Sequence, residues 1–75
     1  MTLTELRYIV AVAQERHFGR AAQRSFVSQP TLSIAIKKLE EELGVSLFDR
    51  SSNEVITTEA GERIVMQARR VLEEA

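Results

Sequence analysis

The stretch "FVSQPTLSIAIKKLEEELG", residues 26–44, predicts one helix with two different sides. Four aliphatic residues recur at helical spacing and predict a side that faces the core: Leu32, Ile36, Leu39 and Leu43. The opposite side of the first two turns carries no carboxylate: Pro30, Ser33, Ile34 and Lys37. A helix that only filled a core would not need this second side, so we expect it to contact a partner.

The ends of this helix have clear signals. Ser28 is a preferred N-cap residue, and Pro30 is acceptable in a first turn because amides there have no intrahelical partner. Gly44 suits the left-handed position that follows a helix. Carboxylates begin only at Glu40, in the C-terminal half. This polarity is typical of a helix that enters a DNA major groove by its N-terminal end.

Two shorter helices are predicted upstream. Thr2 and Glu5 have capping-box spacing, and the helix they begin should run to about Arg16. One broad arc of this helix should face the core: Leu3, Leu6, Ile9, Val10 and Ala13. Tyr8 and Val12 form a second stripe. These two residues could pack inside the monomer, but because the core arc is already filled without them, we interpret this stripe as a dimer contact.

The segment "GRAAQRS", residues 19–25, suits a short second helix with Gly19 as its N-cap. Phe26 and Val27 should be buried turn residues. A short helix that meets the next one through a tight turn is a helix-turn-helix.

Downstream of Gly44 the pattern changes to that of a hairpin. "VSLFDR" and "VITT" are strand candidates, and "SSNE" is the turn between them. Thr58 can cap a last helix, in which four apolar residues have coiled-coil spacing: Ile64, Ala68, Val71 and Ala75. Leu72 widens this seam. Since the seam is still running at Ala75, we expect a longer native protein.

Together these elements predict a mainly α fold, a winged helix-turn-helix of three helices, a small β-hairpin wing and a C-terminal helix. The alternative is three packed helices with a hairpin that has no function. We expect the winged unit at residues 1–57, with the wing at about 45–57, and a last helix from about residue 58 that takes part in a dimer contact.

Composition limits the function classes. The 75 residues make one small domain, and the absence of cysteine excludes disulfides and thiolate metal sites. One histidine cannot build a zinc site, so we expect no metal or cofactor, and His17 should be a helix-end residue. We expect no enzyme, because the sequence has no cysteine and no second histidine, and the chain is too thin to hold a catalytic pocket. Without an apolar run of membrane length or a signal peptide, we expect a cytoplasmic protein.

Charge is unevenly distributed along the chain. From Arg16 to Leu39 there are five basic residues and no acidic one, whereas the remainder has five basic and eleven acidic residues. This window predicts an electrostatic surface for a polyanion. A locally basic segment of an ordinary small domain is the alternative, and Arg20 and Arg24 could be solvated helix charge.

At this point the sequence resembles a known family. "FGRAAQRSFVSQPTLSIAIKKLEEELGVSLFDR", residues 18–50, followed by "TTEAGERIV", residues 57–65, looks like the N-terminal DNA-binding domain of a LysR-type transcriptional regulator. The resemblance covers essentially the whole chain, and within the family the sequence looks nearest to the peroxide-responsive members.

The resemblance implies sequence-specific binding of a double-stranded DNA operator by a homodimer, with a tetramer as an option for the full-length protein. It implies that any small-molecule or redox effector acts through a C-terminal domain that these residues do not contain. It places the helix-turn-helix at about residues 18–37 and makes residues 58–75 the start of a dimerising linker helix. The positions that match DNA contacts in the family are Ser28, Gln29, Pro30, Thr31, Ser33, Ile34, Lys37 and Arg50. The expected dimer contacts are Tyr8, Val12, Ile64, Ala68, Val71, Leu72 and Ala75.

Some alternatives stay open. Many family members carry more basic residues at the wing tip than "SSNE", which puts a minor-groove contact beyond Arg50 in doubt. Arg50 could instead pair with Asp49 or Glu54 in solvent, and Gln29 could be an ordinary surface residue. The whole domain could also be a winged-helix module that binds another protein.

Overall fold

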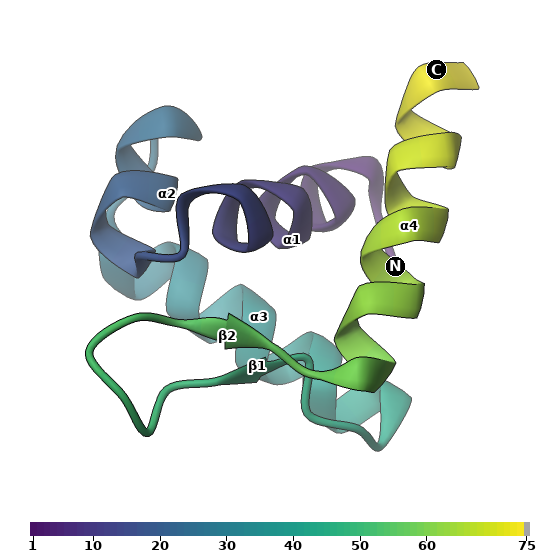
Figure 1. Cartoon of the computed structure of the whole chain (residues 1–75). Helices are drawn as coiled ribbons and strands as arrows, with labels where there is room; N and C mark the ends of the chain where they lie inside the picture. The colour runs from purple at the N-terminus through teal and green to yellow at the C-terminus, as the bar shows by residue number, and fades with distance from the viewer. Residues whose placement is uncertain (75) are drawn as a thin grey trace.

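The computed structural model describes residues 1–74 as four helices and a two-stranded hairpin (Figure 1). The elements in chain order are α1 (Leu3–Glu15), α2 (Phe18–Arg24), α3 (Gln29–Leu43), β1 (Phe48–Asp49), β2 (Ile56–Thr57) and α4 (Glu59–Glu74). In Figure 1 the tip of the hairpin points to the side of the molecule on which α2 stands, and α4 rises at the opposite side. This arrangement is the predicted winged helix-turn-helix.

Helix α1 is the central helix of the domain. The predicted capping box is present: the Thr2 hydroxyl accepts the Glu5 N–H at 3.1 Å, and the Glu5 carboxylate accepts the Thr2 N–H at 2.8 Å. Because α1 packs against α2, α3 and α4, more than one of its sides is buried. Val12 is 0% exposed, so the prediction that Val12 contacts a second copy was wrong. Tyr8 remains partly exposed and packs at the edge of the core.

Helix α2 begins two residues earlier than an N-cap at Gly19 would place it. His17 is the N-cap residue, and its Nδ1 accepts the backbone N–H of Arg20 at 3.0 Å. The prediction of Gly19 as N-cap was therefore wrong, because an imidazole nitrogen can accept the amide hydrogen bond that a glycine cannot. Phe18 is the first helical residue and is buried.

The turn between α2 and α3 is a Schellman-type helix end with an aromatic residue at its left-handed position. Phe26 has a φ of 59°, and the next N–H, that of Val27, donates to the carbonyl of Ala22 at 3.0 Å. Phe26 is 94% exposed, so the prediction that it is buried was wrong, whereas Val27 is partly buried. The left-handed backbone turns the Phe26 side chain away from the core that its neighbour enters.

Helix α3 has the two sides expected from its sequence. Leu32, Ile36 and Leu39 are 0–1% exposed, and Leu43 is partly buried. The Ser28 hydroxyl caps the helix start by accepting the Thr31 N–H, and Gly44 ends the helix at a φ of 71°.

The hairpin is shorter than its strand candidates, with two residues in each strand and the register Phe48↔Thr57 and Asp49↔Ile56. Its return strand is fixed to the end of α1 by the Val55 N–H, which donates to the Arg16 carbonyl at 3.1 Å. The wing therefore occupies a defined position against the helical body.

Helix α4 belongs to the same core as the first 57 residues. Thr58 caps it as predicted, since its hydroxyl accepts the Gly61 N–H at 2.9 Å. Val65 and Ala68 are 6% and 1% exposed, so Ala68 is a core residue and its prediction as a dimer contact was wrong. Ile64 and Leu72 are partly buried, and Val71 is 44% exposed. The predicted contact at Ala75 lies outside the described residues.

Candidate nucleic-acid interface

The N-terminal half of α3 presents one continuous exposed side. Of the eight residues expected to contact DNA, seven are exposed and Ser33 is partly buried. Arg50 is the exposed one in the wing, and those on or next to α3 are Ser28, Gln29, Pro30, Thr31, Ile34 and Lys37. Ile34 is 67% exposed although it is a large aliphatic residue. No acidic residue occurs between Ser28 and Lys38, so this side carries positive charge and hydrogen-bonding groups around one apolar side chain.

Two hydroxyl groups at the start of α3 are linked to each other. The Ser28 hydroxyl donates to the Thr31 Oγ1 at 2.9 Å and accepts the Thr31 backbone N–H at 3.2 Å. Because Ser28 supplies the hydrogen of that bond, the hydroxyl hydrogen of Thr31 is left to donate outward. An exposed O–H donor at a helix start is a suitable contact for a phosphate oxygen.

Gln29, the first residue of α3, lies against the first turn of α2. Its Oε1 is 3.5 Å from the position that a Cβ on Gly19 would occupy. A Cβ there would be in ordinary contact with Gln29 but would crowd the His17 ring, whose Cε1 is 2.8 Å away, so the glycine leaves room for the His17 cap. The starts of α2 and α3 come together at this point.

Arg50, the predicted wing contact, is held by an aromatic ring. Its Cζ lies 3.8 Å from the centroid of the Phe18 ring, at the start of α2. Within residues 1–74 it forms no ion pair with Asp49 or Glu54, so the structure does not support that alternative. The carboxylate of Asp49 accepts the Ser51 N–H at 2.9 Å, which lowers the pKa of Asp49, and Glu54 lies 3.8 Å from Arg16 instead.

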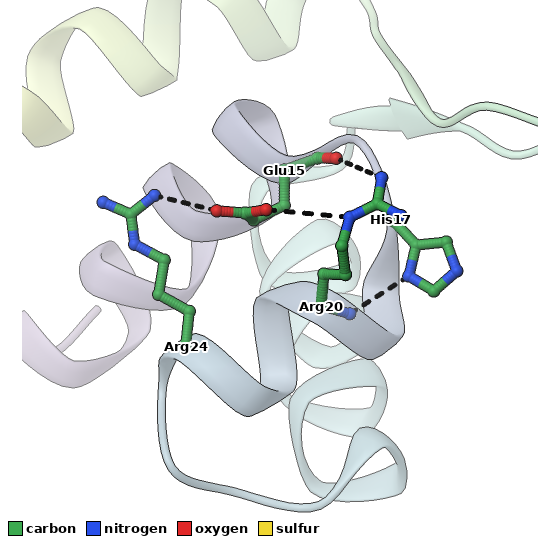
Figure 2. Close-up of polar contacts among 4 residues, drawn as sticks. All are labelled: Glu15, His17, Arg20 and Arg24. Atoms are coloured by element: carbon green, nitrogen blue, oxygen red, sulfur yellow. Dashed lines mark hydrogen bonds and ion pairs between the residues drawn. The ribbon is translucent and has the colours of Figure 1, made fainter.

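The arginines of α2 share a single carboxylate (Figure 2). Glu15, at the end of α1, lies between them: its Oε1 is 3.7 Å from Arg20 Nε, and its Oε2 is 3.2 Å from Arg24 Nη1. Arg20 also donates through Nη2 to the Glu15 backbone carbonyl at 3.1 Å. These side chains are therefore not free solvated charges, although exposed ion pairs of this kind are weak.

Carboxylates that lie outside the basic window, residues 16–39, offset part of its positive charge. Three of its five basic residues, Arg16, Arg20 and Arg24, are paired with Glu54 or Glu15. Lys37 and Lys38 have no such carboxylate partner in the described part of the chain. Within the basic window, the unpaired positive charge is therefore on α3; Arg50 of the wing adds a further cation outside the window.

Some of the residues expected at a dimer contact are accessible on the surface, whereas others are buried in the core. Tyr8 and Leu72 line the same groove, about 540 Å³ in volume, between α1, the turn after α2 and α4. Val71 is exposed on α4, whereas Val12 and Ala68 face the core. Of the remaining candidates, Tyr8 of α1 and Leu72 of α4 thus share one groove, and Ile64 is partly buried on α4.

The described residues contain no group of three or more His, Cys, Asp or Glu side chains that could hold a metal ion. Among the same residues, no helix combines the length and the apolar character that a bilayer crossing requires.

Sequence reasoning missed the parts of this surface that depend on tertiary contacts. Phe48 and Arg50 are two residues apart, so they lie on one face of an extended strand, and this spacing could have placed Arg50 near the core aromatics. Nothing in the sequence indicated that Phe18 would supply the ring. The pairing of Glu15 with two arginines likewise depends on the angle between α1 and α2.

The chain is similar in sequence to known regulatory proteins. Residues 3–62 match the family described as "Bacterial regulatory helix-turn-helix protein, lysR family". A hydrogen peroxide-inducible genes activator from Pectobacterium carotovorum is 55% identical over 74 residues, which are 99% of this chain and 24% of that protein. The chain thus spans about a quarter of the length of that relative.

Two solved structures are similar over nearly all of the chain. A full-length OxyR variant from Pseudomonas aeruginosa has a TM-score of 0.93 and 66% identity, covering 99% of this chain and 25% of that one. The BenM DNA-binding domain, solved in complex with benA site 1 DNA, has a TM-score of 0.94 and 43% identity, covering 99% and 83%.

Proposed function

Because the chain belongs to the lysR family of bacterial regulatory helix-turn-helix proteins and forms their winged helix-turn-helix DNA-binding domain, we propose that α3 enters the major groove of an operator by its N-terminal half. The observation that carries this proposal is the exposed side of α3, which has an uncovered Ile34 and Lys37 and no carboxylate. In the major groove these groups meet base edges and phosphates, whereas in water an exposed isoleucine contributes nothing to stability.

The proposed contacts divide into two kinds. Gln29 and Ile34 contact base edges, because a glutamine amide pairs with adenine and an aliphatic group packs on the thymine methyl. Lys37 contacts a guanine or a phosphate. The other proposed contacts position the helix on the phosphate backbone or line the groove: Ser28, Pro30, Thr31, Ser33 and Arg50.

We further propose that two copies pair through the surface formed by α1 and α4. Tyr8, Ile64, Val71 and Leu72 support this, since they are partly or fully exposed apolar residues on neighbouring parts of the two helices. Residues 58–75 would then begin the linker helix that joins a regulatory domain in a longer protein. A target of chromosomal DNA also favours a cytoplasmic location, and no catalytic role is proposed.

Selection of binding sites from a random duplex library tests the proposal. The enriched sequence and a shuffled control are then titrated with this chain by fluorescence anisotropy, at salt concentrations from about 50 to 200 mM. We expect a preferred sequence with two half-sites, matching a two-fold dimer, and an affinity that falls steeply with salt. Lys37→Ala should weaken binding, whereas Glu41→Ala, near the far end of α3, should not.

The protein-binding alternative predicts a different result. A winged-helix module that binds another protein would enrich no duplex sequence, and its weak attraction to DNA would be the same for the parent and Lys37→Ala. That outcome would overturn the proposed function.

A further inference from the structure

Arg50 is immobilised by an aromatic platform rather than by a carboxylate. Its guanidinium lies over the Phe18 ring at 3.8 Å. The Phe18 ring in turn meets the ring of Phe48 edge-on, with centroids 6.3 Å apart and an interplanar angle of 87°. Both rings are buried, at 7% and 4% exposure, so the surface under Arg50 cannot move freely.

The platform is anchored to three elements. Phe18 is the first residue of α2, which is capped by His17. Phe48 pairs with Thr57 in the hairpin, and its N–H donates to the Glu40 carboxylate of α3 at 3.3 Å. The position of Arg50 is therefore tied to the recognition helix as well as to the wing.

Contact through a ring face leaves the guanidinium able to bind something else. The five N–H donors of arginine lie in the guanidinium plane and point away from a ring placed beneath it. The arginines nearest to this site, Arg16 and Arg20, use their donors on Glu54 and Glu15. Arg50 is therefore held in place while its charge remains available.

The platform residue also adjoins, along α2, the residue that lies against Gln29, a proposed base contact. Phe18 precedes Gly19, and the Gln29 Oε1 lies 3.5 Å from the Cβ position of Gly19. Two consecutive residues of α2 thus support one side chain from the wing and one from the start of α3.

We propose that Phe18 is a positioning residue for DNA binding, which fixes the Arg50 guanidinium at a set offset from Gln29 so that it contacts one phosphate without first being ordered. This inference rests on the proposed function. An arginine that must be ordered during binding loses side-chain entropy, and removal of the platform should therefore weaken binding by roughly three- to tenfold.

A double-mutant cycle with Phe18→Leu and Arg50→Ala tests the inference on the selected duplex. Leucine keeps an apolar side chain in the core and removes the aromatic face. We expect Phe18→Leu to weaken binding three- to tenfold in the parent and to have no further effect in the Arg50→Ala variant. Arg50→Ala should also lower the salt slope by about one unit, whereas Phe18→Leu should leave the slope unchanged, because the phosphate is still contacted.

Several outcomes would overturn it. If Phe18→Leu weakens binding equally in both backgrounds, Phe18 acts only through the fold. If Arg50→Ala binds like the parent, Arg50 contacts no phosphate and the inference fails. The proposed function is tested separately, by the effect of Lys37→Ala on binding through α3. If Phe18→Leu does not fold, a measurement on the parent still tests the inference. The ring current of Phe18 should shift the Arg50 side-chain protons upfield in NMR spectra, and ordinary chemical shifts would show that Arg50 does not lie on the ring.

Discussion

The carboxylate of Glu40, on α3, accepts the backbone N–H of Leu47 at 2.7 Å. The same oxygen lies 3.3 Å from the N–H of Phe48, so one side chain of the recognition helix satisfies two amides at the base of the wing. Glu40 is part of the acidic C-terminal end of α3, yet this contact gives it a structural role that its neighbours lack.

Glu40→Ala should lower the free energy of unfolding by about 1–3 kcal/mol, because two partly buried N–H groups lose their acceptor. Glu40→Gln should cost less, since its carbonyl oxygen can still accept. Urea unfolding measures both, and Glu41→Ala is the matched control, expected within about 0.5 kcal/mol of the parent. Equal stability of the Glu40 and Glu41 variants would mean that water replaces the carboxylate without loss.

Gly61→Ala should destabilise the domain by about 1–3 kcal/mol or more. A Cβ at this position would overlap the backbone carbonyl of Leu47 and lie 2.9 Å from Thr57 Cγ2, so α4 would have to move away from the hairpin. Gly44→Ala is the comparison, because that site is open but has a φ of 71° and should cost about 1 kcal/mol through strain alone. A Gly61→Ala variant as stable as Gly44→Ala would contradict the close approach of α4.

Phe26→Gly should stabilise the domain by about 0.5–1 kcal/mol. The substitution relieves the left-handed strain, and this gain exceeds the added entropy of a glycine in the unfolded chain. Little packing is lost, since Phe26 is 94% exposed. Thermal unfolding of Phe26→Gly and Phe26→Ala distinguishes strain from packing, because alanine keeps the Cβ and should not stabilise.

Ile34→Ala should leave folding nearly intact and weaken operator binding by about 1 kcal/mol, less than the loss of a bidentate base contact. Replacement of the contacted thymine by uracil removes only the methyl group. The parent should lose the same amount on this duplex, and Ile34→Ala should lose nothing. If both proteins respond equally to the missing methyl, Ile34 does not contact it.

Val71→Glu should shift the chain from dimer to monomer in sedimentation equilibrium, because a carboxylate would replace an apolar group that is 44% exposed on the proposed contact surface. Met66→Glu is the matched control. Met66 is 56% exposed on another side of α4, so its substitution should leave association unchanged. The proposed surface is wrong if the two variants associate equally.

Local signals predicted most of the fold. The Thr2–Glu5 capping box, the Ser28 cap, the glycine end of α3 and the Thr58 cap each depend on residues a few positions apart, and all are present. Apolar periodicity likewise identified the core side of α3. These features could be predicted because a helix places its own near neighbours.

The errors arose where one local signal had two solutions or where several helices met. His17 and Gly19 could both begin α2, and the imidazole cap decided between them. The second stripe of α1 was apolar because α1 is covered on several sides, so Val12 belongs to the core rather than to a partner. The contact of Arg50 with Phe18 joins residues far apart in the sequence and could not be predicted from either one.

The shared carboxylate of Glu15 also bears on how such a domain would find its target in a chromosome. An operator competes with roughly 10⁶–10⁹ other sites, where attraction comes almost entirely from phosphate contacts. Glu15 offsets part of the positive charge of Arg20 and Arg24, so neither adds its full charge to the attraction for unrelated DNA. We therefore expect this pairing to shorten the residence time at unrelated sites rather than to raise the affinity for the operator.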